Sequence, residues 1–304
     1  MPDWSRTLID ILGAECRSVL PPEVELPVMP KAALEFAEKS RDENTSAKQL
    51  GDIIETDAVL TAELLKQVNS AAIGLRRKCA SAGQAIALLG PRNTRLFVLT
   101  VGLKQAAQKH DSKLFNLKQF WATNYERAIF AREVASLLNA DAELAYAAAM
   151  LQDFLLPTLA NEMTDRYIEL LARQAKSEDQ RLDELERATF GWDHAFAAAT
   201  LMRVWNFPDD LVVCVAMHHL GRAVLDDAEF GRTAAAAVAL AGLVPDATRQ
   251  SPVGLDTLVE LDASWEPFDL AQVATAVAEK HAEVNSYANH IPLARRVDRA
   301  LAPA

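Results

Sequence analysis

The sequence contains few cysteines and no closely spaced pair of them. Its three cysteines, Cys16, Cys79 and Cys214, lie far apart and form no C-x-x-C motif. A zinc ribbon needs such pairs and a disulfide framework needs an even, dense set, so neither class is expected. We expect structural thiols in a reducing compartment, the cytoplasm.

Long hydrophobic runs are also absent. The first twenty residues carry acidic side chains and no extended apolar core, so they do not look like a secretory signal. The most apolar run, 234–244, has only eleven residues, whereas a membrane-spanning helix needs about 20. We therefore expect no membrane association. The run is predicted to be a buried, closely packed helix, with a self-association face that makes a homo-oligomer as the alternative.

Positive charge is in deficit, and glycine and aromatic residues are scarce. The chain has 31 Lys and Arg against 42 Asp and Glu, which gives a net charge of −11. Such a surface repels phosphate backbones, so nucleic acid is not an expected partner. Abundant alanine with only 11 glycines favours helices, because alanine has the highest helix propensity and glycine a low one.

Helical spacing of apolar side chains continues along most of the chain after Pro30. Ser46, Asp57 and Ser81 stand where N-caps are expected, and Gly90 precedes a proline that opens another helix. No alternating segment of useful length predicts a strand. The predicted fold is all-α, with two packed helical lobes and extra helices at the C-terminus.

Three features of the second half bear on the candidate site. The acidic run 177–186 is predicted to be an exposed helix face. Gly191 and Trp192 are expected to separate two helices, with Asp193 capping the second. Pro208 is expected to open the helix that carries His218 and His219.

Two stretches of the chain resemble a known family. The first is "LPVMPKAAL…SAKQLGDIIETDAVLTAELLKQVNSAAIG…SAGQAIALLG", and the second is "LAYAAAMLQDF…ERATFGWDHAFAAATLMRVWNFPDDLVVCVAMHH". Both resemble the HDOD domain, a bacterial signalling module related to the HD superfamily of metal phosphohydrolases. The resemblance runs from about Leu26 to His219. It departs from the family at Ala58, where a proline is usual, and at Gln152, where relatives often have histidine.

The resemblance implies a domain organisation and a function. A helix and linker (1–21) precede an HDOD domain (22–221), which consists of an N-terminal lobe (22–115) and an HD-like lobe (116–221). A helical extension (222–304) follows. The implied function is non-catalytic bacterial signal transduction, in which the module binds an unidentified signalling protein.

The HD superfamily binds divalent metal through histidines and a His-Asp pair. The resemblance places the family's ligands at Thr123 or Asn124, Gln152, Asp153, His194, and His218 or His219. Neutral imidazoles and a carboxylate can hold a cation and lower the pKa of a bound water. Gln152, Thr123 and Asn124 supply no imidazole, and an amide is a poor ligand for a transition metal.

We therefore predict no cofactor, no metal and no catalysis. Neighbouring residues of one α-helix point about 100° apart, so a shared ion is awkward for His218 and His219. Asp153, His194, His218 and His219 are treated as vestiges of a metal site. Asp153, His194 and one of the pair are expected to form a buried hydrogen-bonded cluster that holds three helices together.

Two other functions stay open at this point. One is a metal-dependent phosphohydrolase that uses Asp153 and the three histidines on a nucleotide or cyclic dinucleotide. The other is a second-messenger receptor with a basic patch at Arg76 and Arg77. Asn69 and Ser70, together with Arg76 and Arg77, are the candidate interaction residues; a helix end with its turn is the simpler reading of Asn69 and Ser70.

Overall fold

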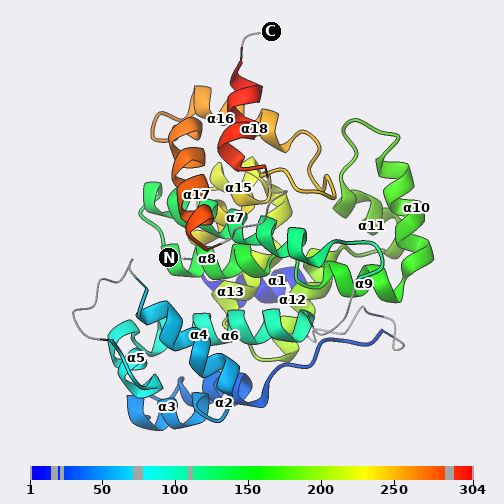
Figure 1. The fold of residues 1–304 in the computed structure, drawn as a ribbon. Helices are drawn as coiled ribbons and strands as arrows, with labels where there is room; N and C mark the ends of the chain where they lie inside the picture. Colours follow the sequence, from blue (N-terminus) through cyan, green and yellow to red (C-terminus); the bar gives the residue numbers. More distant parts are fainter. Residues whose placement is uncertain are drawn as a thin grey trace. The chain divides into compact units, whose positions relative to one another are not determined.

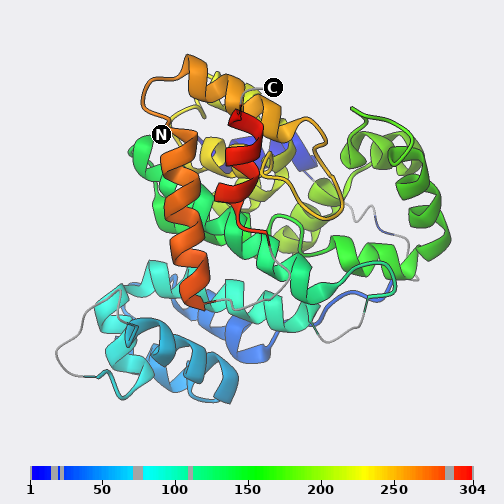
Figure 2. The ribbon, with the colours of Figure 1, turned by 45° about the horizontal axis from the view of Figure 1, so that its top comes forward.

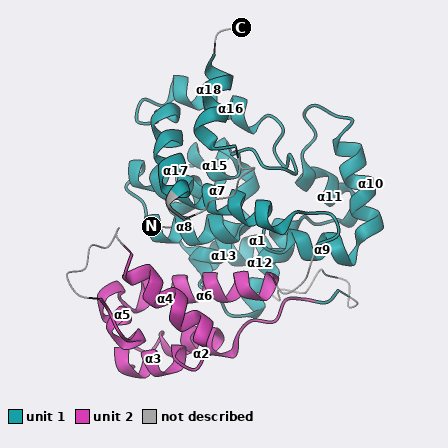
Figure 3. Cartoon of the chain, viewed as in Figure 1, with its two compact units in different colours: residues 1–25, 111–304 teal, residues 26–110 magenta. Residues whose placement is uncertain are grey.

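The computed structural model describes residues 2–14, 20, 24–70, 78–108, 112–284 and 291–302. These residues form two compact units, one of residues 26–110 and one of residues 1–25 with 111–304 (Figure 3). Arg76 and Arg77 lie outside the described residues. Each unit is described by itself below.

The unit of residues 26–110 is built from five helices. They are α2 (Lys31–Lys39), α3 (Ala47–Ile54), α4 (Ala58–Val68), α5 (Ala82–Leu89) and α6 (Pro91–Ala107). Side chains that the sequence predicted as caps begin three of them. Ser46 and Asp57 accept hydrogen bonds from backbone N–H groups of α3 and α4, and Ser81 does the same for α5.

Close backbone contact joins α3 and α5 in this unit. A Cβ added at Gly51 would lie 2.5 Å from the backbone nitrogen of Gly83, so only glycine fits there. The apolar stripe of α4, Leu60, Leu64 and Val68, is fully buried. Packing of apolar side chains therefore holds this unit together.

The larger unit contains thirteen α-helices and one 3₁₀ turn among the described residues. In chain order these are α1 (Trp4–Leu12), α7 (Leu117–Leu137), α8 (Ala142–Leu151), α9 (Leu156–Glu162), α10 (Thr164–Gln174), α11 (Leu182–Phe190), α12 (His194–Val204), α13 (Asp209–Ala216), η1 (His218–Leu220), α14 (Arg222–Leu225), α15 (Ala234–Ala241), α16 (Gly254–Ser264), α17 (Leu270–Val284) and α18 (Leu293–Leu301).

The alanine-rich helix α15 lies at the centre of this unit. Every residue from Ala234 to Ala241 is buried, and the helix packs against α7, α8, α13, α14 and η1 (Figure 1). Small side chains let these backbones approach closely. Helix α17 packs against α7 and α18, and α16 contacts α17 and α18 (Figure 2). The predicted buried helix is therefore present. It packs directly against η1, the turn that carries two histidines of the candidate site.

The prediction of an all-α chain is confirmed for the described residues, in which no strand occurs. The larger unit includes 1–25 and 222–304, segments that the sequence analysis treated as separate from the HD-like lobe. In the part of the chain that is described, none of the helices combines the length and apolar character that crossing a bilayer requires.

Candidate functional site

The end of α8 carries Asp153 into the interior. The helix runs to Leu151, Gln152 follows as its C-cap, and Asp153 comes next, with both side chains 0 % exposed. A buried carboxylate needs partners for both of its oxygens. The surroundings of Asp153 Oδ1 and Oδ2 therefore define the site.

A guanidinium from α7 covers one of the two oxygens. Arg127 is 1 % exposed, and its Nη1 donates to Asp153 Oδ2 at 2.7 Å. Its Nη2 donates to Asp246 Oδ2 at 2.6 Å, and Nε and Nη2 both donate to the Val244 carbonyl. Arg127 thus joins two carboxylates through charge-assisted hydrogen bonds.

A histidine at the start of α12 contacts the other oxygen. Gly191 ends α11 in the left-handed conformation, and Asp193 caps α12 by accepting from the Phe196 N–H. This turn brings His194 back against Glu186 of α11. Glu186 Oε2 accepts from the His194 backbone N–H at 2.9 Å and lies 2.6 Å from its Nδ1, which leaves Nε2 3.2 Å from Asp153 Oδ1.

The paired histidines do not lie on an α-helix, which corrects the prediction. Helix α13 ends at Ala216, and His218 and His219 form the 3₁₀ turn η1. Gly221 closes the turn with φ +52°, and Gly242 lets α15 approach it, because a Cβ there would lie 2.3 Å from the His218 carbonyl oxygen. The ring centroids of the two histidines are 3.8 Å apart, so the two rings lie side by side.

Four ligand atoms consequently meet around Asp153 Oδ1. One atom each from Asp153, His194, His218 and His219 lies within 4.8 Å of all the others. His218 Nε2 lies 3.2 Å from Asp153 Oδ1, and His219 Nε2 lies 2.9 Å from His194 Nε2. A shared ion was expected to be awkward for two neighbours on an α-helix, but the 3₁₀ turn places a ring nitrogen of each near the same carboxylate.

The charges of the site shift its pKa values in opposite directions. Burial by itself would raise the pKa of Asp153, but contacts with His194 and His218 and the charge of Arg127 hold it well below the usual range. Burial opposes the charged form of His194, yet Glu186 and Asp153 raise its pKa well above normal. Burial and the charges of its two histidine neighbours push the pKa of His219 well below normal.

Further charged and polar side chains surround Glu186, His194 and His219. Glu186 Oε1 accepts from the Tyr167 hydroxyl at 2.8 Å, and burial beside Glu186 raises the pKa of Tyr167 well above normal. Arg187 pairs with Asp183 and Asp193, and Arg181 donates to Asp183 and to the His219 carbonyl. The acidic run 177–186 is thus not simply an exposed face, because Asp183 and Glu186 are both 0 % exposed. Asp183 and Glu186 are three residues apart, and each directly follows a buried leucine, Leu182 or Leu185. This spacing was the signal in the sequence from which their burial could have been predicted.

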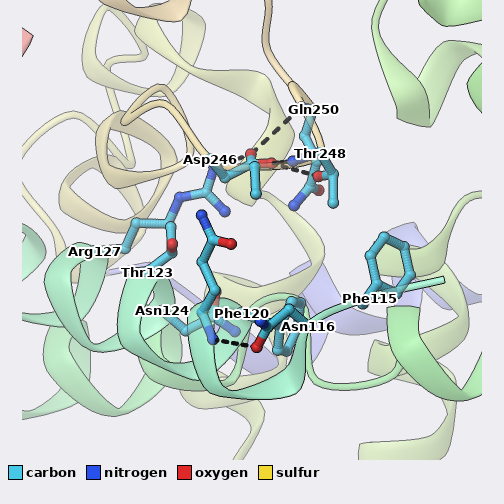
Figure 4. A pocket seen from close by; sticks show the side chains of 11 residues that line it. Phe115, Asn116, Phe120, Thr123, Asn124, Arg127, Asp246, Thr248 and Gln250 are labelled. Carbon is cyan, nitrogen blue, oxygen red and sulfur yellow. Dashed lines mark hydrogen bonds and ion pairs between the residues drawn. The ribbon is translucent and has the colours of Figure 1, made fainter. Parts of the chain in front are cut away.

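A small cavity of about 30 Å³ lies beside Arg127 (Figure 4). Its described lining contains none of the site histidines and consists of Phe115, Asn116, Gln119, Phe120, Thr123, Asn124, Arg127, Asp246, Ala247, Thr248 and Gln250. Thr123 and Asn124, two of the positions where the resemblance placed a ligand, therefore face this cavity. Arg127, which belongs to both the cavity and the cluster, stands between the cavity and Asp153.

Two of the candidate interaction residues, Asn69 and Ser70, belong to the unit of residues 26–110. The side-chain amide of Asn69 accepts from the Cys79 N–H at 2.7 Å and donates to the Cys79 carbonyl at 2.9 Å. Asn69, the C-cap of α4, therefore links the end of this helix to the backbone of Cys79. The Ser70 N–H donates to the Gln67 carbonyl in the turn that follows α4.

A family model for the HDOD domain matches residues 26–220. The chain belongs to the HDOD family. An uncharacterized protein of Treponema pallidum (strain Nichols) is 25 % identical over 202 residues, which is 64 % of this chain and 38 % of that protein. The match thus spans well under half of the Treponema relative.

Solved structures share the fold of this HDOD protein. An HDOD domain protein of unknown function from Geobacter sulfurreducens has a TM-score of 0.64 at 19 % identity, covering 93 % of this chain and 98 % of that one. A protein from Shewanella amazonensis SB2B that carries a provisional phosphohydrolase name has a TM-score of 0.60 at 21 % identity, covering 93 % and 94 %. At these identities the likeness establishes the fold alone.

The residues fit a divalent transition metal on one side of Asp153 and not on the other. Oδ1 faces three imidazole nitrogens, a donor set suited to zinc or iron. Oδ2 faces the permanently charged guanidinium of Arg127. A pair of adjacent metal ions bridged by Asp153 would need both sides, so the cluster does not fit a two-metal centre.

Proposed function

We propose that this HDOD protein is a non-catalytic signal-transduction module that acts by binding a partner protein. One observation carries the non-catalytic part. Asp153, His194 and His218 are at most 1 % exposed, and Arg127 forms an ion pair with Asp153 Oδ2. A phosphate ester has no route to these groups through the cavity, whose described lining includes Arg127 and none of the histidines.

Hydrolysis of a phosphodiester by this fold requires an ion with an open coordination position. The bound water attacks from that position, and the substrate oxygens approach the same ion. Arg127 would have to leave Asp153 and Asp246 to make such room, and each of these carboxylates would then be left without its cation. The phosphohydrolase alternative is disfavoured on this ground.

Hydrolysis is tested directly with the full chain. Wild type and Asp153→Asn are incubated with bis(p-nitrophenyl) phosphate and with cyclic dinucleotides in the presence of Mn²⁺, Fe²⁺, Mg²⁺ or Zn²⁺. We expect no turnover above the Asp153→Asn background with any metal. Turnover that the variant lacks would overturn the proposal and establish the phosphohydrolase.

Partner binding is tested through the candidate interaction residues. Tagged wild-type chain is crosslinked in its native host beside the charge-reversed variant Arg76→Glu/Arg77→Glu. A matched control reverses Arg295 and Arg299, two exposed arginines of α18. We expect one protein that is enriched with wild type and control and at least tenfold depleted with the Arg76/Arg77 variant. Equal enrichment by all three would remove these arginines from the proposal.

A further inference from the structure

Hydrogen bonds fix which ring nitrogen carries the proton in two of the clustered histidines. Nδ1 of His218 lies 2.7 Å from the Val215 carbonyl oxygen, which can only accept, so this nitrogen carries hydrogen. Nδ1 of His194 lies 2.6 Å from a carboxylate oxygen of Glu186. In the neutral form of both rings Nε2 is then the atom that offers a lone pair to a metal ion, and such carbonyl and carboxylate contacts are those that orient metal-binding imidazoles.

The spacing of these donor atoms suits a single four-coordinate ion. Around a zinc ion with bonds of about 2.0–2.1 Å, ligand atoms in a tetrahedron stand about 3.3 Å apart. Here the Asp153 Oδ1 atom lies 3.2 Å from Nε2 of both His194 and His218. His219 Nε2 lies 2.9 Å from His194 Nε2, and all four ligand atoms lie within 4.8 Å of one another, close enough for one ion to gather them.

His218 Nε2 points independently to a ligand. It is buried, and no hydrogen-bond partner for it occurs among the described residues, although it faces Asp153 Oδ1. In the neutral form of this ring Nε2 presents a lone pair to the carboxylate oxygen 3.2 Å away, and the two repel each other. A cation between the two atoms turns this repulsion into attraction.

The balance of charges at the site also favours a cation. Two carboxylates, those of Asp153 and Asp246, share the guanidinium of Arg127, and a third, that of Glu186, contacts His194. Both aspartates and the arginine belong to one hydrogen-bonded chain, and Glu186 reaches it through His194. With the histidines in the neutral form that binds a metal, this buried region carries two more negative than positive charges, and uncompensated charge there is costly. A divalent ion balances them.

We propose that Asp153, His194, His218 and His219 bind one divalent cation of the zinc class in a closed structural site, with Arg127 acting as a built-in second cation on Asp153. Four protein ligands saturate a tetrahedral ion, which is the mark of structural rather than catalytic zinc. The ion joins the end of α8, the start of α12 and the turn η1. Its role is to stabilise the larger unit.

The test measures bound metal and stability in the full chain. Protein stripped with a chelator is reconstituted with Zn²⁺, desalted and analysed for metal by mass spectrometry. We expect one zinc per chain and a thermal midpoint about 5–10 °C above that of the stripped protein. Reconstitution with Co²⁺ should give the intense visible absorption of tetrahedral cobalt.

Matched histidine variants separate loss of the ligand from loss of the fold. His218→Gln should abolish stoichiometric zinc binding and the thermal shift. His281→Gln is the control, because His281 is also buried but its Nε2 contacts the Ala122 carbonyl outside the cluster. The control variant should still bind one zinc.

Each outcome bears on a definite part of the proposal. No zinc in the wild type would overturn it, even if every variant failed to fold. Two zinc ions per chain would overturn the role of Arg127 as the second cation, and equal zinc in His218→Gln and wild type would overturn the assigned ligands. Hydrolysis by the zinc-loaded protein would instead contradict the proposed function and leave the metal site standing.

Discussion

The two units of the chain are stabilised by different kinds of interior. Among the described residues of 26–110, the buried polar side chains are Ser40, Thr94 and Thr100, and none is charged. The larger unit buries Glu126, Arg127, Asp153, Asp183, Glu186 and Asp193, together with three histidines. Apolar burial is tolerant of exchange, whereas a buried ionic network fails when one member is removed. The larger unit should therefore be the more sensitive of the two to loss of a single buried charged side chain.

The largest effect that this comparison predicts comes from removing the central guanidinium. Arg127→Met leaves Asp153 and Asp246 buried without their cation, and we expect it to lower the free energy of unfolding by about 3–5 kcal/mol. The matched variant in the other unit is Arg95→Met, which loses two hydrogen bonds to Ser40. It should cost about 1–2 kcal/mol. Urea denaturation measures both, and equal losses would refute the comparison.

A smaller effect is expected from filling two close backbone contacts. Gly242→Ala presses against the His218 carbonyl, and Gly51→Ala presses against the backbone of Gly83. Each should lower the free energy of unfolding by about 1–3 kcal/mol, the usual cost of overpacking. Only Gly242→Ala displaces η1, so zinc binding should weaken in that variant alone. Unchanged zinc affinity in Gly242→Ala would show that η1 does not depend on this contact.

The smallest predicted effect compares two helix caps. Asp57 caps α4 by accepting from the Val59 and Leu60 N–H groups. Asp57→Ala should cost about 1 kcal/mol. Asp193 caps α12 and also pairs with Arg187, so Asp193→Ala should cost more. Thermal unfolding of the two variants gives the order, and a larger loss for Asp57→Ala would contradict it.

The fold could be predicted from the sequence because its signals are local. Ser46, Asp57 and Ser81 mark helix starts through side-chain bonds to nearby N–H groups, and Gly90 and Pro91 mark a boundary. The apolar run 234–244 indicated a buried helix through its composition alone. None of these inferences needed information about distant residues.

The site could be predicted only in part because its geometry depends on distant contacts. His218 and His219 continue the apolar pattern of α13, so periodicity placed them on that helix. The 3₁₀ turn that unites them depends on Gly221 and on Gly242, which lies 21 positions further along. Arg127, Glu186 and Asp246 were missed as well, because nothing local in the sequence separates a buried charged residue from an exposed one.

The account depends on the Asp153 centre being closed, and X-ray absorption at the zinc edge of the reconstituted protein tests this most directly. We predict a first shell of four nitrogen and oxygen atoms with the outer-shell signal of imidazoles, unchanged when inorganic phosphate is added in excess. A missing zinc signal, a five- or six-atom shell, or a phosphorus neighbour that appears with phosphate would contradict the account.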